Sequence, residues 1–200
     1  MFGCLKICRN KKAMMIPILL LFNIKKGLIK FEEKYIDELY RESFITSVFY
    51  GIILSFQQDL FNKTENLILN IFLFIISICL LLLLAILFSY FTYKMIVFFK
   101  GEIYYEETFS LLVYSYFPMF LLSLLMFFLK NPDLEHFDFN TIHFRNLITI
   151  LISFISFRIL FKGLKRICKI SFVKTVIVTL PILLIPTIFF IYIIYLYSFN

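Results

Sequence analysis

The stretch from residue 67 to residue 93 constrains the chain most, because it carries no charged side chain and is apolar almost throughout. At 1.5 Å per residue, a helix of this length is longer than the hydrocarbon core of a bilayer, which is about 30 Å thick. The strict alternation of apolar and polar residues that marks a transmembrane β-strand is absent here. Backbone groups must be satisfied internally in lipid, so the stretch predicts a membrane-spanning α-helix.

The composition extends this prediction to the whole chain. The 200 residues are 62% hydrophobic and only 16% charged, whereas a soluble protein has about 25% charged residues. We therefore expect an all-α fold, a polytopic transmembrane helix bundle. It divides into a cytoplasmic basic and amphipathic amino-terminal segment (residues 1–42) and a membrane domain (residues 43–200) with five spans, at about 43–61, 67–93, 108–129, 146–161 and 172–197.

The amino-terminal segment contains two shorter apolar elements. Residues 13–22 form an apolar run that is too short to span a bilayer, so we expect it to lie at the interface, and the sequence leaves open whether it enters the lipid. In residues 27–42, Ile29, Ile36 and Leu39 share one helical face among acidic and basic residues. This spacing predicts an amphipathic helix on the membrane or on the bundle.

The distribution of basic residues predicts the orientation. With the amino terminus inside, 17 of the 20 Lys and Arg residues fall on cytoplasmic segments, and only Lys63, Lys130 and Arg145 fall outside. Cytoplasmic loops are enriched in Lys and Arg, so we expect a cytoplasmic amino terminus and an outer carboxyl terminus. This topology accounts for the net charge of +7, and we expect no nucleic-acid partner.

Groups that could carry chemistry are few. The outer loop holds Asp133, Glu135, His136, Asp138 and His143, but their spacing fits no helix-face zinc motif. We expect a solvated loop there, with no metal site, no cofactor and no catalytic residues. Spans lack mid-helix acids, which proton-coupled transport or intramembrane proteolysis would need. The four cysteines match no metal or redox spacing, so we expect unpaired thiols.

Prolines interrupt two of the predicted spans. Pro118 lies in the third span, and Pro181 and Pro186 lie in the fifth. A proline lacks the N–H that would bond the carbonyl four residues earlier, so Pro118 leaves the carbonyl of Tyr114 without its helical partner. The sequence leaves two interpretations open, a hinge or polar cavity that Tyr114 and Tyr116 line, and a static packing kink.

The end of the fourth predicted span carries a stripe of basic residues. Arg158, Lys162, Lys165 and Lys169 follow at helical spacings of four, three and four. Such a stripe can hold anionic lipid headgroups, each basic residue contributing about 1 kcal/mol. The same residues also fit plain retention of positive charge on the cytoplasmic side.

The region from Lys100 to Pro118 resembles a known family. The segment runs Lys-Gly-Glu-Ile-Tyr-Tyr-Glu-Glu-Thr-Phe-Ser from Lys100 to Ser110, and Tyr-Ser-Tyr-Phe-Pro follows at Tyr114 to Pro118. It resembles the centre of the YIP family of Ypt/Rab-interacting membrane proteins, particularly the bacterial branch. The resemblance marks these family-motif residues as a possible functional site: Gly101, Glu106, Thr108, Phe109, Tyr114, Tyr116 and Pro118.

The resemblance implies a small non-enzymatic multi-pass protein of the bacterial cytoplasmic membrane. The Asp-Leu-Tyr-Gly-Pro motif of eukaryotic members is not found in this sequence, so a GTPase partner does not follow. We expect the protein to organise membrane or to serve as a subunit of a membrane complex, with anionic lipids, other membrane proteins or itself as partners. The alternative is a transporter or permease subunit for a neutral or lipid-like solute, which a midplane cavity lined by Tyr114, Tyr116 and Thr179 would favour.

Overall fold

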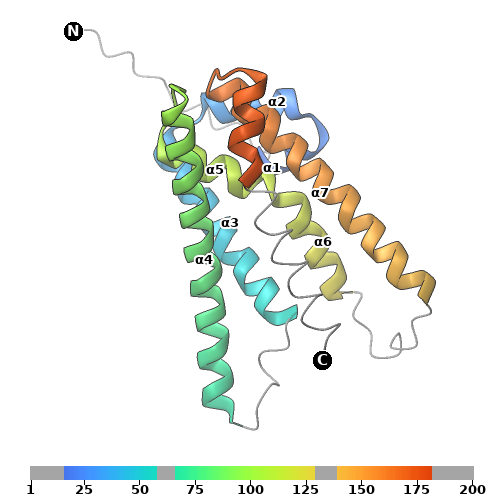
Figure 1. Ribbon diagram of the computed structural model, residues 1–200. Helices are drawn as coiled ribbons and strands as arrows, with labels where there is room; N and C mark the ends of the chain where they lie inside the picture. Colours follow the sequence, from blue (N-terminus) through green and yellow to red (C-terminus); the bar gives the residue numbers. More distant parts are fainter. Residues whose placement is uncertain (1–15, 58–65, 129–138, 182–200) are drawn as a thin grey trace.

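A computed structural model describes residues 16–57, 66–128 and 139–181, and all regular elements in these ranges are helices (Figure 1). The all-α prediction is confirmed there. The helices are α1 (Ile16–Phe22), α2 (Ile24–Glu33), α3 (Ile36–Gln57), α4 (Leu67–Phe98), α5 (Tyr105–Ser115), α6 (Phe117–Phe128) and α7 (Phe139–Ile167), followed by a short apolar helix, Phe172–Pro181. Three segments of the described chain are long and apolar enough to cross a membrane: Leu67–Phe98, Tyr105–Leu125 and Leu147–Ile167.

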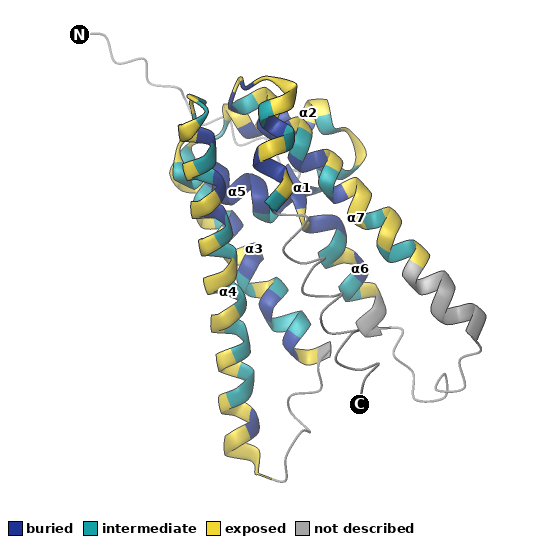
Figure 2. Ribbon diagram, in the orientation of Figure 1, coloured by how far each residue is buried: buried dark blue, intermediate teal, exposed yellow. Residues whose placement is uncertain are grey.

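Helices α4 and α5 occupy opposite environments in the bundle (Figure 2). No residue in the most apolar 18-residue window of α4 is buried by the protein, and α4 runs along one side of the bundle. By contrast, α5 contacts α1, α3, α4 and α7, and most of its residues are buried. The apolar surface of α4 is therefore available to lipid, while α5 is the centre of the fold.

Buried and half-buried hydroxyl groups on these helices bond mainly to their own helix backbone. The donors reach carbonyls three or four residues earlier, at 2.7–3.1 Å, and are Ser43, Thr46, Ser55, Ser89, Thr92, Thr108, Ser110, Ser115 and Thr179. This back-bonding satisfies a hydroxyl without a partner helix. Two pairs also join helices: Ser43 and Ser110 at 2.9 Å link α3 to α5, and Ser55 donates to Ser77 at 3.1 Å across α3 and α4.

A tight corner ends α4. Lys100 has a positive φ of 59°, its N–H bonds to the Val97 carbonyl at 2.9 Å, and the Gly101 N–H bonds to the Ile96 carbonyl at 2.9 Å. These bonds form a Schellman motif, which satisfies carbonyls that the helix end leaves free. Here Lys100, and not the following Gly101, adopts the left-handed conformation.

The amino-terminal helices differ from the sequence-based expectation. A single amphipathic helix over residues 27–42 is not found, because Lys34 is extended (φ −86°, ψ 147°) and separates α2 from α3. The short helix α1 contacts α5, α6 and α7, with Leu20 fully buried. Residues 16–22 thus pack against the bundle, and their position at the membrane interface stays a prediction.

Several span boundaries also differ. The predicted third span is two helices that meet at Tyr116, and Pro118 is the second residue of α6, where a missing N–H costs little. Helix α7 begins at Phe139, inside the predicted outer loop, and extends through the basic segment to Ile167. Residues 182–197 of the predicted fifth span, including Pro186, lie outside the described residues.

Candidate functional site around helix α5

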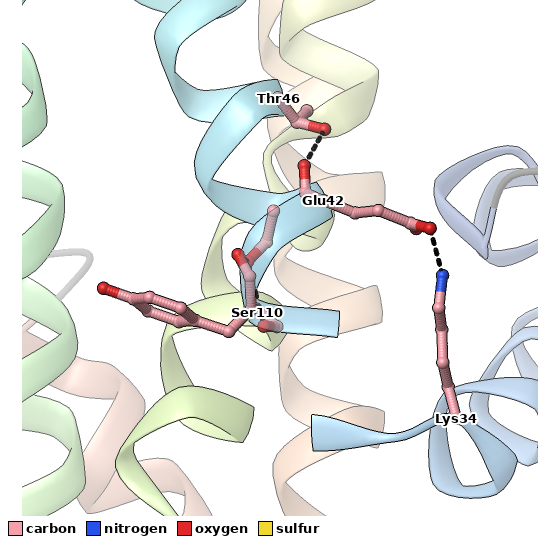
Figure 3. A network of polar contacts seen from close by, with 6 residues as sticks. Lys34, Glu42, Thr46 and Ser110 are labelled. Atoms are coloured by element: carbon pink, nitrogen blue, oxygen red, sulfur yellow. Dashed lines mark hydrogen bonds and ion pairs between the residues drawn. The ribbon is translucent and has the colours of Figure 1, made fainter. Parts of the chain in front are cut away.

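A polar network joins the α2–α3 connection to the start of α3 (Figure 3). The Lys34 ammonium forms an ion pair with the Glu42 carboxylate, and the Lys34 side chain is only 17% exposed. The Thr46 hydroxyl donates to the Glu42 carbonyl at 2.8 Å. Together with the hydroxyl contact between Ser43 and Ser110, this network holds Lys34, the first half of α3 and α5 together.

Tyr114 of α5 lies near Glu42, which belongs to this network. Its side chain is 1% exposed, and its ring packs edge-on against Phe31 of α2 with centroids 6.2 Å apart. Its hydroxyl makes no well-formed hydrogen bond to the described residues, and the Glu42 carboxylate is close enough to act on it as a charge and as a distant hydrogen-bond acceptor. A buried hydroxyl without a partner costs about 1–3 kcal/mol, so the packing of the ring must offset that cost.

The family-motif residues that precede Tyr114 in the sequence each have a structural role in the α4–α5 corner or in α5. A Cβ on Gly101 would lie 2.6 Å from Ile96 Cγ2 and 2.9 Å from Ile170 Cγ2, so the α4–α5 corner needs a glycine for close packing. Glu106 lies in the first turn of α5, where a negative charge interacts favourably with the helix dipole. Thr108 and Phe109 are fully buried.

Tyr116 and Pro118 belong to a different region from Tyr114. Residues two apart on a helix do not share a face, and Tyr116 is 39% exposed whereas Tyr114 faces α2. Pro118 is buried at the start of α6. The structure therefore brings the predicted residues onto α5 and its two ends, but it does not gather them into one pocket.

Tyr116 lines a cavity of about 430 Å³, here called the lateral groove. Its walls come from α3, α4, α5 and the start of α6: Thr46, Ser47, Tyr50, Gly51, Leu54, Leu81, Ala85, Phe88, Ser89, Leu112, Val113, Tyr116, Phe117 and Phe120. Tyr114 and Thr179 are not among them, and the Thr179 hydroxyl donates to the Thr175 carbonyl at 2.9 Å. The described residues therefore do not form the cavity lined by all three residues that would favour a transporter.

The basic stripe is on the exposed surface of the bundle. Arg158, Lys162, Lys165 and Lys169 are all exposed. Lys165 lies 5.9 Å from the Phe172 ring centroid, and Lys169 lies 3.6 Å from the Glu102 carboxylate. The neighbouring Arg166 instead binds Glu32 of α2 through two hydrogen bonds of 2.8 Å. Arg166 thus anchors α2 to α7, and the four stripe residues face outward.

Metal and thiol chemistry have little support in the described part of the chain. No group of three or more His, Cys, Asp or Glu residues could hold a metal ion there. The predicted outer-loop group, Asp133, Glu135, His136, Asp138 and His143, lies outside the residues whose side chains are described. Burial, and secondarily the charge of Glu107, raises the pKa of the Cys168 thiol to about 12, so this cysteine stays protonated and weakly nucleophilic.

Sequence reasoning missed the α3 and α4 residues of the lateral groove. A signal was present, because Ser47, Gly51 and Ser55 recur at intervals of four, as do Ala85 and Ser89. Small residues at this spacing typically mark close helix packing in membranes. The ion pair between Lys34 and Glu42 carried no comparable signal, since it depends on the break between α2 and α3 at Lys34.

Comparisons with known proteins give one match. A family model described as the Yip1 domain matches residues 38–194. No curated protein matches the chain, and no solved structure matches it. The matched region includes α3 except for its first two residues, all of α4 to α7, and every residue of the predicted family-motif site.

Proposed function

Because the chain belongs to the Yip1 domain family, we propose that this integral membrane protein is non-enzymatic and organises the membrane or serves as a subunit of a membrane complex. The hydrogen bonding of the buried hydroxyl groups on α5 is the main support for a non-enzymatic role. Those of Thr108, Ser110 and Ser115 on α5 donate to carbonyls of α5 itself. These bonds satisfy the hydroxyls inside an apolar environment, so the hydroxyls present no free reactive group to a substrate.

The proposal includes five spans and a defined orientation. Residues 16–42 would sit at the cytoplasmic face, with α2 as an amphipathic helix whose Gly27, Leu28 and Phe31 face the bundle. The carboxyl terminus would be outside. The unequal distribution of Lys and Arg supports this orientation, and the family resemblance supports placement in a bacterial cytoplasmic membrane.

Reporter fusions will test the topology. A reporter active only outside the cytoplasm should be active when fused after Asn200 or inserted in residues 130–138, and inactive when fused after Gly101. The expectation follows from the positive-inside rule. The matched control is a reporter active only in the cytoplasm, which should give the opposite pattern. A cytoplasmic carboxyl terminus would contradict the five-span arrangement.

We further propose that the basic stripe binds anionic lipid headgroups. Arg158, Lys162 and Lys165 are exposed on the last part of α7, and Lys169 is exposed just beyond the end of that helix, where its φ of 51° departs from helical geometry. Long basic side chains at such a position can reach the headgroup layer. Arg166 would contribute less, because Glu32 already binds its guanidinium group.

Replacing Arg158, Lys162 and Lys165 with Gln should weaken the stabilisation by anionic lipid. At about 1 kcal/mol per basic residue, the triple variant should lose most of the rise in unfolding temperature that phosphatidylglycerol produces in mixed micelles. A control variant with Lys25, Lys26 and Lys30 replaced by Gln removes equal charge from α2. An equal loss in both variants would indicate nonspecific charge attraction.

The second candidate function is a transporter or permease subunit for a neutral or lipid-like solute. The lateral groove favours it, because it is a cavity of ligand size lined in part by α4, whose apolar surface is available to lipid. It ranks second because Tyr114 and Thr179 do not line the groove. The proline-containing third and fifth predicted spans therefore do not line one common cavity. Uptake by reconstituted vesicles would distinguish the two functions.

A further inference from the structure

We propose that the lateral groove holds one acyl chain of a bilayer phospholipid. The inference rests on the membrane-spanning architecture proposed above and goes beyond it by assigning a ligand class to a specific cavity. The groove lies between α3, α4 and the α5–α6 junction. Its bottom is protein, since Leu112 is 5% exposed and Phe117 is 8% exposed.

The lining presents mainly carbon atoms to an occupant, although it includes the hydroxyl-bearing residues Thr46, Ser47, Tyr50, Ser89 and Tyr116. Two of its hydroxyls are already bonded to backbone: Thr46 donates to the Glu42 carbonyl at 2.8 Å, and Ser89 donates to the Ala85 carbonyl at 2.7 Å. The rings of Tyr50 and Phe120 pack edge-on with centroids 5.7 Å apart. A polar solute would lose its hydration here and gain few hydrogen bonds, whereas a hydrocarbon chain would lose nothing by leaving the surrounding lipid.

Small residues create the space. Gly51 on α3 and Ala85 on α4 line the groove opposite large aromatic side chains from α6. Gly51 is placed where a Cβ would meet only ordinary contacts, the nearest being Ile78 at 3.4 Å. An unfilled space of this size would deprive the lining of dispersion contacts, so an apolar occupant is favourable.

The groove is continuous with the lipid-facing surface of α4. Leu81 and Ala85 line it, and the neighbouring residues Leu80 and Leu84 are 54% and 41% exposed on the outer face. An acyl chain can therefore enter sideways without leaving hydrocarbon. A helix from a partner fits less well, since one turn of a helix 10–12 Å wide occupies about 420–610 Å³, and the groove would hold one turn only.

Tryptophan quenching tests the occupant directly, because the chain contains no Trp. Phe88→Trp places a probe in the groove wall, and Phe91→Trp places one on the lipid-facing side of the same helix, where Phe91 is 45% exposed. Phe109→Trp gives a fully buried reference on α5. Each variant is reconstituted in phosphatidylcholine vesicles whose acyl chains carry bromine, which quenches Trp on contact.

We expect Phe88→Trp to be quenched nearly as strongly as Phe91→Trp, and Phe109→Trp only weakly. Adding Ala85→Phe should fill the groove and remove most of the quenching of the Phe88→Trp probe. Adding Leu84→Phe, on the lipid-facing surface of α4, should leave the quenching of the Phe88→Trp probe unchanged. If Phe88→Trp disturbs folding, Phe120→Trp on the opposite wall provides the same measurement.

Three results would overturn the proposal. Weak quenching of Phe88→Trp, equal to that of Phe109→Trp, would mean that the groove is closed in a bilayer. Quenching that survives Ala85→Phe would mean contact with ordinary surrounding lipid. Stronger quenching by aqueous iodide than by brominated lipid would mean a water-filled path. Failure of the membrane architecture itself would show separately, as loss of quenching in Phe91→Trp.

Discussion

Gly27→Ala should destabilise the protein by about 1–3 kcal/mol, the usual cost of overpacking. A Cβ at Gly27 would lie 2.8 Å from the Leu20 backbone nitrogen and 2.9 Å from Leu20 Cα. A backbone cannot rotate away as a side chain can, so α1 would have to move. Because α1 packs against α5, α6 and α7, that movement would disturb the bundle centre.

The sign of the effect is informative, because Ala ordinarily stabilises a helix relative to Gly by about 0.5–1 kcal/mol. The measurement is the unfolding temperature in detergent. Gly51→Ala is the matched control, since its Cβ would meet Ile78 at 3.4 Å, and it should be neutral or slightly stabilising. A Gly27→Ala protein as stable as Gly51→Ala would mean that α1 and α2 do not pack this closely.

Tyr114→Ala should cost about 3–5 kcal/mol, as for other large aromatic side chains removed from a core. The ring is 1% exposed and packs on Phe31, so its loss leaves a cavity between α2 and α5. Tyr114→Phe keeps the ring and removes a hydroxyl that has no hydrogen-bond partner among the described residues. That variant should be neutral or more stable by up to about 1 kcal/mol.

Unfolding temperatures of the two variants check this prediction, with Tyr116→Ala as the control. Tyr116 is 39% exposed, so its removal should cost clearly less than Tyr114→Ala. If Tyr114→Phe is as harmful as Tyr114→Ala, the hydroxyl makes a bond in the membrane, and Glu42 is the first partner to examine. A double variant with Glu42→Gln would then show coupling between the two side chains.

Some elements could be predicted from neighbouring residues alone. The span at 67–93 corresponds to α4, Leu67–Phe98, because an uninterrupted apolar run is a local signal. The family resemblance, based on Lys100 to Pro118, is confirmed by the match over residues 38–194. The break at Lys34 and the division of the third span at Tyr116 were not predicted, because each depends on how the flanking helices pack.

The sequence by itself determined that this is an all-helical membrane protein. The reason is local: in lipid each backbone group bonds within its own segment, so hydropathy along the chain is sufficient. Tertiary structure decided which side chains are central and where the lateral groove lies. Those outcomes depend on pairs such as Ser43 and Ser110, 67 residues apart, and Glu32 and Arg166, 134 residues apart. Small residues permit close approach of helix backbones, but only the packed bundle determines which helices meet.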